Sequence, residues 1–245
     1  MAIQTAIDSI SNSTAGSPFG FKNRIINGGM VIDQRNAGAS VTPTDGSYSL
    51  DRWKFGLTQT SKLTAQQNAG SVTPPAGFKN YLGFTSNSAY TPSSTDVFSF
   101  YQVIEGYNVA DLGWGTTNAK TVTVSFWVYS SLTGTFGGCI QNSAVGYAYP
   151  FTYTISSTNT WTQISVTIPG DTTGTWLTTN GIGINVTFSL GAGSTYSGTA
   201  GSWAATEYDS CTGATSVVGT NGATWYITGV QLEVGASASS FDVRD

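Results

Sequence analysis

Acidic side chains are the residues of this sequence best suited to catalysis, because the chain has 13 Asp and Glu residues and no histidine. Without histidine, it lacks the usual general base, the histidine-dependent nucleophiles and the commonest transition-metal ligand. Glycoside hydrolysis needs only two carboxylates, and four lie near aromatic residues: Glu105, Asp111, Glu207 and Asp209. Their spacing does not pair them across a cleft. We therefore predict a non-enzymatic protein, with a polysaccharide depolymerase as the less favoured alternative.

Metal and cofactor sites have no clear signal in the sequence. Two cysteines, Cys139 and Cys211, are too few for a disulfide framework. A single bridge between them stays open, although two free buried thiols are the favoured interpretation. No P-loop, dinucleotide fingerprint or zinc-spaced cysteine set occurs, so no cofactor and no metal ligand is predicted. A structural calcium ion, held by carboxylate and backbone oxygens, stays open.

Aromatic side chains are the best candidates for binding, since the chain has seven Trp and twelve Tyr residues. Most large aromatic residues of a β-sandwich lie in its core, and we predict this for Trp53, Trp161 and Trp225. Nine others occur in glycine-rich polar segments or on the strand face opposite a row of valines. They are predicted as candidates for stacking on a glycan: Tyr107, Trp114, Trp127, Tyr129, Tyr147, Tyr149, Trp176, Tyr196 and Trp203.

Composition limits the partners that the chain can have. The net charge is −4 and only 9% of the residues are charged, whereas nucleic-acid binding needs clustered cations. No apolar run approaches the roughly 20 residues of a membrane span. The amino terminus has neither the basic nor the continuous apolar region of a signal peptide. We expect no nucleic acid, no membrane insertion and no classical secretion.

Alternating patterns predict β-strands after residue 20. In Thr121–Ser130 the even-numbered residues are apolar up to Val128, and Gly181–Leu190 and Thr160–Pro169 alternate in the same way. Further strands are predicted at the following ranges: Arg24–Arg35, Trp53–Gln67, Tyr81–Thr85, Val97–Ile104, Thr135–Asn142, Phe151–Ile155 and Thr224–Val234. Gly229, where the apolar parity of the last strand changes, is predicted to form a bulge. Strands at this density predict an all-β, antiparallel two-sheet β-sandwich, a jelly roll, over residues 22–245.

Residues 1–21 differ from the rest and are predicted to be an anchor and linker, extended or helical. Ile3, Ile7 and Ile10 have the a/d spacing of a coiled coil, and isoleucine at both positions favours trimers. So short a helix is marginal in isolation. An anchor that orders in an oligomer and a frayed tail are both open.

Two segments carry a resemblance to a known family. Asn23–Arg35 (NRIINGGMVIDQR), followed by Asp51-Arg52-Trp53, resembles the opening of a family of bacteriophage virion proteins found as tail-fibre, tail-associated or head-decorating components. Trp225–Val234 (WYITGVQLEV), then 235–241, resembles the closing strand of the same family. The middle strands, such as Gln102–Glu105 (QVIE) and Thr160–Pro169, resemble those of carbohydrate-binding-module jelly rolls. The resemblance covers about residues 22–243.

The resemblance implies a virion protein, assembled in the host cytoplasm, that displays its jelly roll on the particle as a capsid decoration, head fibre or tail fibre. Other virion proteins of the capsid or tail are the implied partners, with a homotrimer as the usual assembly and host-surface glycan as a ligand. The alternative is a stand-alone carbohydrate-binding module. For the motif residues themselves we expect structural ion pairs, Arg24 with Glu233 and Asp33 with Arg35, that tie the first and last strands together.

Overall fold

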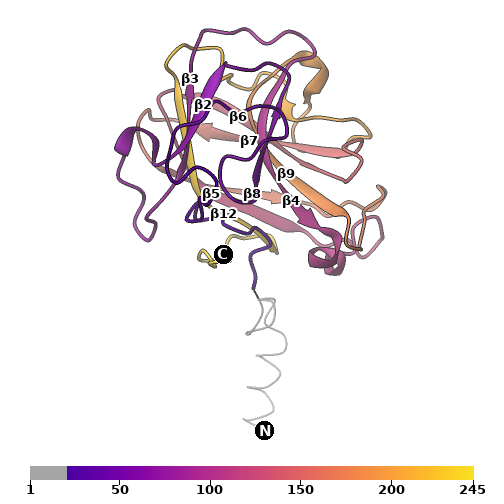
Figure 1. The fold of residues 1–245 in the computed structure, drawn as a ribbon. Coiled ribbons are helices and arrows are strands. Elements are labelled where there is room, and N and C mark those ends of the chain that lie inside the picture. Colours follow the sequence, from indigo (N-terminus) through magenta and orange to yellow (C-terminus); the bar gives the residue numbers. More distant parts are fainter. Residues whose placement is uncertain (1–20) are drawn as a thin grey trace.

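A computed structural model describes residues 21–245, in which two five-stranded β-sheets pack face to face (Figure 1). Sheet I has the strand order β2-β3-β12-β5-β8, and sheet II has the order β1-β4-β9-β6-β7. Every strand pair within the two sheets is antiparallel. This confirms the predicted antiparallel jelly-roll sandwich. The predicted anchor, with Ile3, Ile7 and Ile10, lies outside the described residues.

Eight of the ten predicted strand ranges agree closely with observed strands. Sheet I consists of β2 (Leu63–Gln67), β3 (Leu82–Ser86), β12 (Thr224–Val234), β5 (Val122–Ser130) and β8 (Thr162–Ile168). Sheet II consists of β1 (Trp53–Leu57), β4 (Val97–Glu105), β9 (Ile182–Ala192), β6 (Gly134–Gln141) and β7 (Ala148–Ile155). The connections carry a two-stranded parallel pair and four 3₁₀ turns: β10 (Ser197–Gly198), β11 (Ser210–Cys211), η1 (Ala69–Ser71), η2 (Gly106–Asn108), η3 (Ala110–Leu112) and η4 (Ser194–Tyr196). Among residues 21–245, no helix has the length and apolar character needed to cross a membrane.

Interlocking aromatic rings fill the space between the sheets. Phe100 of sheet II contacts Phe84 of sheet I at a ring distance of 4.7 Å, and Trp225 of sheet I at 5.5 Å. Phe188 of sheet II stacks on Phe100 at 5.3 Å and meets Phe126 of sheet I edge to face at 5.0 Å. All five rings are at most 1% exposed. Such pairs add to the free energy gained from burying the rings, so these contacts hold the two sheets together.

The opening segment is not the strand that the sequence predicted over Arg24–Arg35. Asn27 and Met30 have left-handed backbone conformations, with φ of 55° and 57°, which interrupt a regular ladder. The Asn27 side chain accepts a hydrogen bond from Ile32 N and donates to Ile32 O and Asp51 O. The segment therefore folds around the Asn27 amide, and the prediction of a strand here was wrong.

Two further sequence predictions need correction. Trp53–Gln67 is not one strand, because the chain turns after Leu57 and enters the other sheet at Leu63. Trp161 does not lie between the sheets. It has the same strand parity as the exposed Ser165, and its ring packs on the outer face of sheet I, 5.4 Å from Tyr81.

Gly229 forms the predicted bulge in β12. It has a φ of 64°, and the pairing of β12 with β5 shifts register between Thr228 and Gln231. A Cβ at Gly229 would lie 2.6 Å from the Phe78 ring and 3.2 Å from that of Trp127. Glycine is therefore needed both for the left-handed turn and for the close approach of these rings.

The predicted ion pairs also differ from those observed. Arg24 pairs with Asp111 at 2.7 Å instead of Glu233, and Arg35 lies 3.9 Å from Asp51 instead of pairing with Asp33. Glu233 and Asp33 instead accept hydrogen bonds from residues close to them in the sequence. Glu233 accepts from Ser239 N and from Gln231 Nε2, both at 2.7 Å, and Asp33 accepts from the backbone amides of the turn at 36–38.

Replacing Phe100 with alanine removes the ring that contacts aromatic residues of both sheets. We expect Phe100→Ala to lower the free energy of unfolding by about 3–5 kcal/mol, as for other buried phenylalanines. Chemical denaturation measures this. Tyr107→Ala is the control, because that side chain is 67% exposed and its loss should change stability by less than about 0.5 kcal/mol. Equal effects of the two substitutions would contradict the role given to the ring core.

Candidate functional site

Five of the nine predicted glycan-binding aromatics gather into one cluster at an edge of the sandwich. Trp114, Trp176 and Trp203 meet edge to face, with ring distances of 4.7, 5.3 and 5.4 Å. Tyr147 stacks on Trp203 at 5.8 Å, and Tyr149 meets Trp203 at 5.1 Å. Three loops and the start of β7 thus converge on Trp203, which sequence spacing does not reveal.

This cluster is mainly a structural one. Trp114 and Tyr149 are each only 6% exposed, so they are not the surface rings that the sequence predicted. The indole N–H of Trp114 donates to Lys120 O, that of Trp176 to Asp171 Oδ2 and that of Trp203 to Pro169 O. The gap beside Trp114 and Trp176 has a volume of about 10 Å³, too small for a sugar. The rings therefore mostly bind one another.

The other four candidates lie apart from this cluster. Tyr107 is exposed in η2. Tyr129, on the outer face of sheet I, stacks on Tyr226 at 5.3 Å with the rings 4° from parallel. Trp127, on the same face, borders a hollow of about 320 Å³ with Phe78 and Phe241. Tyr196 lies across the molecule, in a larger cleft on sheet II.

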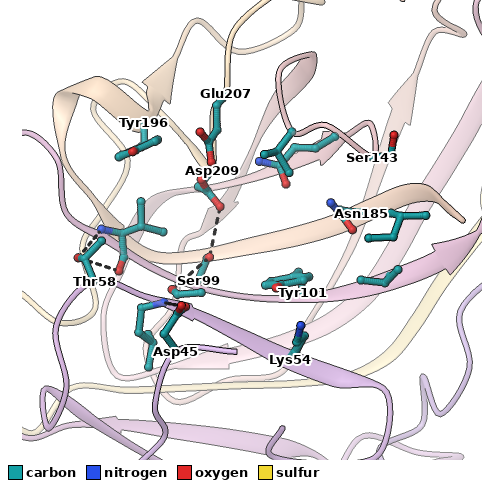
Figure 2. Close-up of a pocket in the computed structure, with 17 residues that line it drawn as sticks. Asp45, Lys54, Thr58, Ser99, Tyr101, Ser143, Asn185, Tyr196, Glu207 and Asp209 are labelled. Carbon is teal, nitrogen blue, oxygen red and sulfur yellow. Dashed lines mark hydrogen bonds between the residues drawn. The ribbon is translucent and has the colours of Figure 1, made fainter. Parts of the chain in front are cut away.

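The cleft on the outer face of sheet II is the strongest candidate site, with a volume of about 400 Å³ (Figure 2). Its floor comes from the outward-facing residues of four strands: Lys54 and Gly56 of β1, Ser99, Tyr101 and Val103 of β4, Asn185 of β9 and Gln141 of β6. Loop residues form its walls: Asp45, Thr58, Ser143, Val145, Tyr196, Glu207 and Asp209. Ligand pockets in proteins typically have volumes of 300–1,000 Å³, so the cleft can hold a small molecule or a short oligomer.

Strand alternation positions the floor of the cleft. Phe98 and Phe100 of β4 point into the ring core and are fully buried, so Ser99 and Tyr101 between them must point outward. Asn185 lies between the core residues Ile184 and Val186 of β9 in the same way. Side chains on strands are held more rigidly than those on loops. The floor is therefore preorganised.

Asp209 is the most perturbed ionisable group of the cleft. Its side chain is nearly buried, and desolvation raises its pKa to about 6, with a further rise from the charge of Glu207. Ser99 Oγ donates to Asp209 Oδ1 at 3.3 Å, which opposes the rise only partly. Burial, with the charge of Asp45 as the next cause, raises the pKa of Tyr101. A carboxyl group perturbed by burial and a like charge in a cleft is typical of a functional site.

Two amides on the floor differ in how they are held. Gln141 is fixed, because its Nε2 donates to Tyr208 O and its Oε1 accepts from Thr187 Oγ1. Asn185 is 5% exposed, and its Oδ1 has no hydrogen-bond partner in residues 21–245. Buried polar atoms are nearly always paired. An unpaired acceptor at the cleft therefore indicates a position where a ligand donor is expected.

The described part of the chain does not offer a metal centre. Across residues 21–245, no three or more His, Cys, Asp or Glu side chains are grouped so that they could hold a metal ion. The two cysteines are free and buried, as the sequence favoured. Burial raises the pKa of the Cys139 thiol and raises that of Cys211 to about 11, so both stay protonated and unreactive at neutral pH.

Sequence reasoning found only part of this site. Tyr196 was among the glycan-binding candidates, and Glu207 and Asp209 were noted as acidic residues near aromatics. Tyr101 and Asn185 were missed. The signal that could have found them is their outward position on strands whose other face is apolar, combined with polar or aromatic character.

Comparison with known proteins gives neither a family nor a curated relative, because no family model and no curated protein matches the chain. Three similar solved structures can be described. A putative sugar-binding protein from Bacteroides thetaiotaomicron has 10% identity and a TM-score of 0.48, with coverage of 87% of this chain and 100% of the other. The module TmCBM61, in complex with β-1,4-galactotriose, has 10% identity and a TM-score of 0.42, with coverage of 87% and 99%.

The third structure is the enzymatically active domain of tailspike protein 4 from bacteriophage CBA120. It has 12% identity and a TM-score of 0.46, and the match covers 87% of this chain. The matched part is 22% of the tailspike chain. At these identities the likeness concerns architecture, so a function for the cleft rests on its own residues.

The raised pKa of Asp209 predicts a pH-dependent stability. Because the folded state binds this proton more tightly than the unfolded state, the carboxyl stabilises the fold at acid pH and loses that contribution as the pH rises through about 6. The rise from 3.8 to about 6 corresponds to about 3 kcal/mol. Asp209→Asn should therefore stabilise the protein at about pH 8, by up to that amount, and have little effect at about pH 4.

Urea denaturation at the two pH values measures this difference. Glu207→Gln is the matched control, because it removes the neighbouring charge and leaves the burial of Asp209 in place. It should keep most of the pH dependence. A gain in stability from Asp209→Asn that is the same at both pH values would show that ionisation of Asp209 is not its cause.

Proposed function

We propose that the protein is a non-catalytic glycan-binding module whose ligand lies in the cleft on sheet II. The observation that carries the proposal is the composition of the cleft, in which Tyr101 and Tyr196 occur together with Asn185 and the carboxylates. Sugars present apolar C–H faces and many hydroxyl groups. Tyrosine rings can stack on the C–H faces, and amides and carboxylates can form hydrogen bonds with the hydroxyl groups.

The arrangement of the polar groups suits binding. Asn185 offers both a donor and an acceptor, carboxylates accept from hydroxyl groups, and Lys54 donates. Gln141 and Ser99 are already bonded within the protein and so act as a fixed part of the floor. A cleft built this way recognises a ligand without rearranging the sheet, which limits the entropy lost on binding.

A polysaccharide depolymerase is the second candidate function, and the raised pKa of Asp209 favours it. A general acid in glycoside hydrolysis needs such a carboxyl group, with a second carboxylate on the other side of the scissile bond. Glu207 is two residues from Asp209 on the same segment, and Asp45 Oδ1 accepts from Leu57 N to hold its own loop. We therefore favour binding without cleavage.

The cleft residues should determine glycan affinity. Tyr101→Ala removes a ring from the floor and should weaken binding of the recognised oligosaccharide roughly 2- to 13-fold, the range for an aromatic contact. Asn185→Ala should weaken it by a similar factor. A glycan array identifies the oligosaccharide, and calorimetry measures its affinity.

Trp127→Ala is the matched control, because this half-buried ring lies on the outer face of the opposite sheet. Loss of binding in Trp127→Ala, with none in Tyr101→Ala, would place the glycan site on sheet I. Release of reducing ends from the same oligosaccharide, abolished by Asp209→Asn, would favour the depolymerase.

We further propose that the module is displayed on a bacteriophage particle, as a capsid decoration, head fibre or tail fibre and in a homotrimer. The supporting observation is that the two segments that carry the family resemblance bind each other. Asn23 Oδ1 accepts from Leu232 N, Asn23 Nδ2 donates to Val230 O, and Arg24 N donates to Leu232 O. The two motifs thus form one structural unit.

Mass spectrometry of purified particles tests the virion proposal, with the protein expected in stoichiometric amounts. Its absence from particles, with the protein present in the infected cell, would overturn the proposal and leave the stand-alone module. Imaging of labelled particles then separates capsid from tail, and light scattering of the full chain measures whether it is trimeric.

A further inference from the structure

The charge of the cleft is unbalanced. Three carboxylates line it, those of Asp45, Glu207 and Asp209, and Lys54 is the basic residue among the described side chains of its lining. The two acids of the 207–209 segment repel each other, since the charge of Glu207 raises the pKa of Asp209. Figure 2 shows Glu207 and Asp209 on one side of the strand that carries Ser99, and Asp45 on the other. Negative charge therefore borders the cleft on two sides.

Hydrogen-bond acceptors are also in excess. The Oδ1 atom of Asn185, on a side chain that is 5% exposed, has no donor in residues 21–245. Asp209 receives one side-chain bond, the 3.3 Å contact from Ser99, although an ionised carboxylate can accept about four. The broad χ2 torsion of asparagine lets its amide turn toward a bound molecule. The cleft therefore suits a ligand that brings donors.

A metal ion is one way to satisfy such acceptors, but the geometry does not provide it. Among residues 21–245 these carboxylates do not form a metal-holding group of three or more. Carboxylates that are spread along a cleft instead match donors that are spread along a molecule. An ammonium group supplies three donors and a positive charge at one point.

Resting on the glycan-binding function proposed above, we propose that the cleft selects sugars that carry an amine and rejects sugars that carry a carboxylate. An amino sugar keeps the apolar ring face that Tyr101 and Tyr196 can contact, and its ammonium relieves the repulsion between Glu207 and Asp209. A uronate meets two like-charged walls, and such juxtaposition is strongly unfavourable. Neutral sugars fall between the two.

Matched oligosaccharides test this selection. The β-1,4-linked tetramers of glucosamine, glucose and glucuronic acid share the gluco configuration and differ in one charged group per ring. The corresponding tetramers with the galacto configuration form a second set. Calorimetry on the full chain at low salt should give affinities in the order amine, neutral, acid, with steps of about tenfold. Raising the salt concentration should reduce both steps, because screening weakens exposed charges.

A charge-removal variant separates the cleft from the net charge of the protein. Glu207→Gln should reduce the ratio of amine to neutral-sugar affinity several-fold, because it removes one of the charges that attract the ammonium group. Asp245→Asn is the matched control, because it removes one negative charge from an exposed residue outside the cleft and should leave the preference as it is.

The outcomes distinguish the inference from the function beneath it. If the neutral tetramer binds and the uronate binds equally well or better, the charge selection is wrong and the glycan site stands. If the preference for amine is the same in Glu207→Gln and in the parent, the carboxylates of the cleft are not its source. If none of the tetramers in either set binds and no oligosaccharide on the glycan array binds either, the glycan-binding proposal itself fails.

Discussion

The contact between aromatic rings of the two sheets is the constraint on which the rest of the structure depends. Phe100 and Phe188 can reach Phe84, Phe126 and Trp225 only if alternate residues of β4 and β9 point inward. Because successive side chains of a strand point to opposite faces, the residues between them then point outward, except at bulges. The core thus assigns Tyr101 and Asn185 to the cleft, although neither takes part in the ring packing. A one-residue slip of β4 would bury Tyr101 and expose Phe100.

The walls of the cleft depend on a different kind of contact. The segment that carries Glu207 and Asp209 is held by the parallel pairing of β10 with β11, and Asp209 N donates to Tyr196 O at 2.9 Å. This segment lies directly on sheet II, since a Cβ at Gly137 would be 2.7 Å from Ser210 Oγ and 2.9 Å from Cys211 N. The position of Asp209 is therefore coupled to that of Tyr196. These two wall residues are therefore held in a fixed relation to each other and to the floor.

The sequence predicted the strands whose stability comes from alternation, and it failed where side chains replace the backbone ladder. β5, β9 and the bulge in β12 follow from parity and from Gly229, which are local properties. The Asn27 amide binds two backbone groups of Ile32, within the segment predicted as a strand, and the distant Asp51 O, and no periodicity encodes that. Likewise, parity indicates that Asn185 faces outward, but only the strand order of sheet II places β9 next to β4, so that Asn185 and Tyr101 line one cleft with Tyr196. The burial of Trp114 and Tyr149 could not be predicted for the same reason, because the rings that cover them come from separate loops.

Asp209 supports the proposal that this cleft binds a ligand. A buried carboxyl whose pKa is raised to about 6 is ionised at neutral pH at the expense of folding free energy. An asparagine at this position could still accept a bond from Ser99 without that expense, so packing alone does not require the acid. Glu207, which is exposed, increases the expense by its charge. Both features are explained if a bound molecule supplies hydrogen-bond donors and positive charge to this side of the cleft. Relief of the repulsion between Glu207 and Asp209, which destabilises the ligand-free protein, then adds to the free energy of binding.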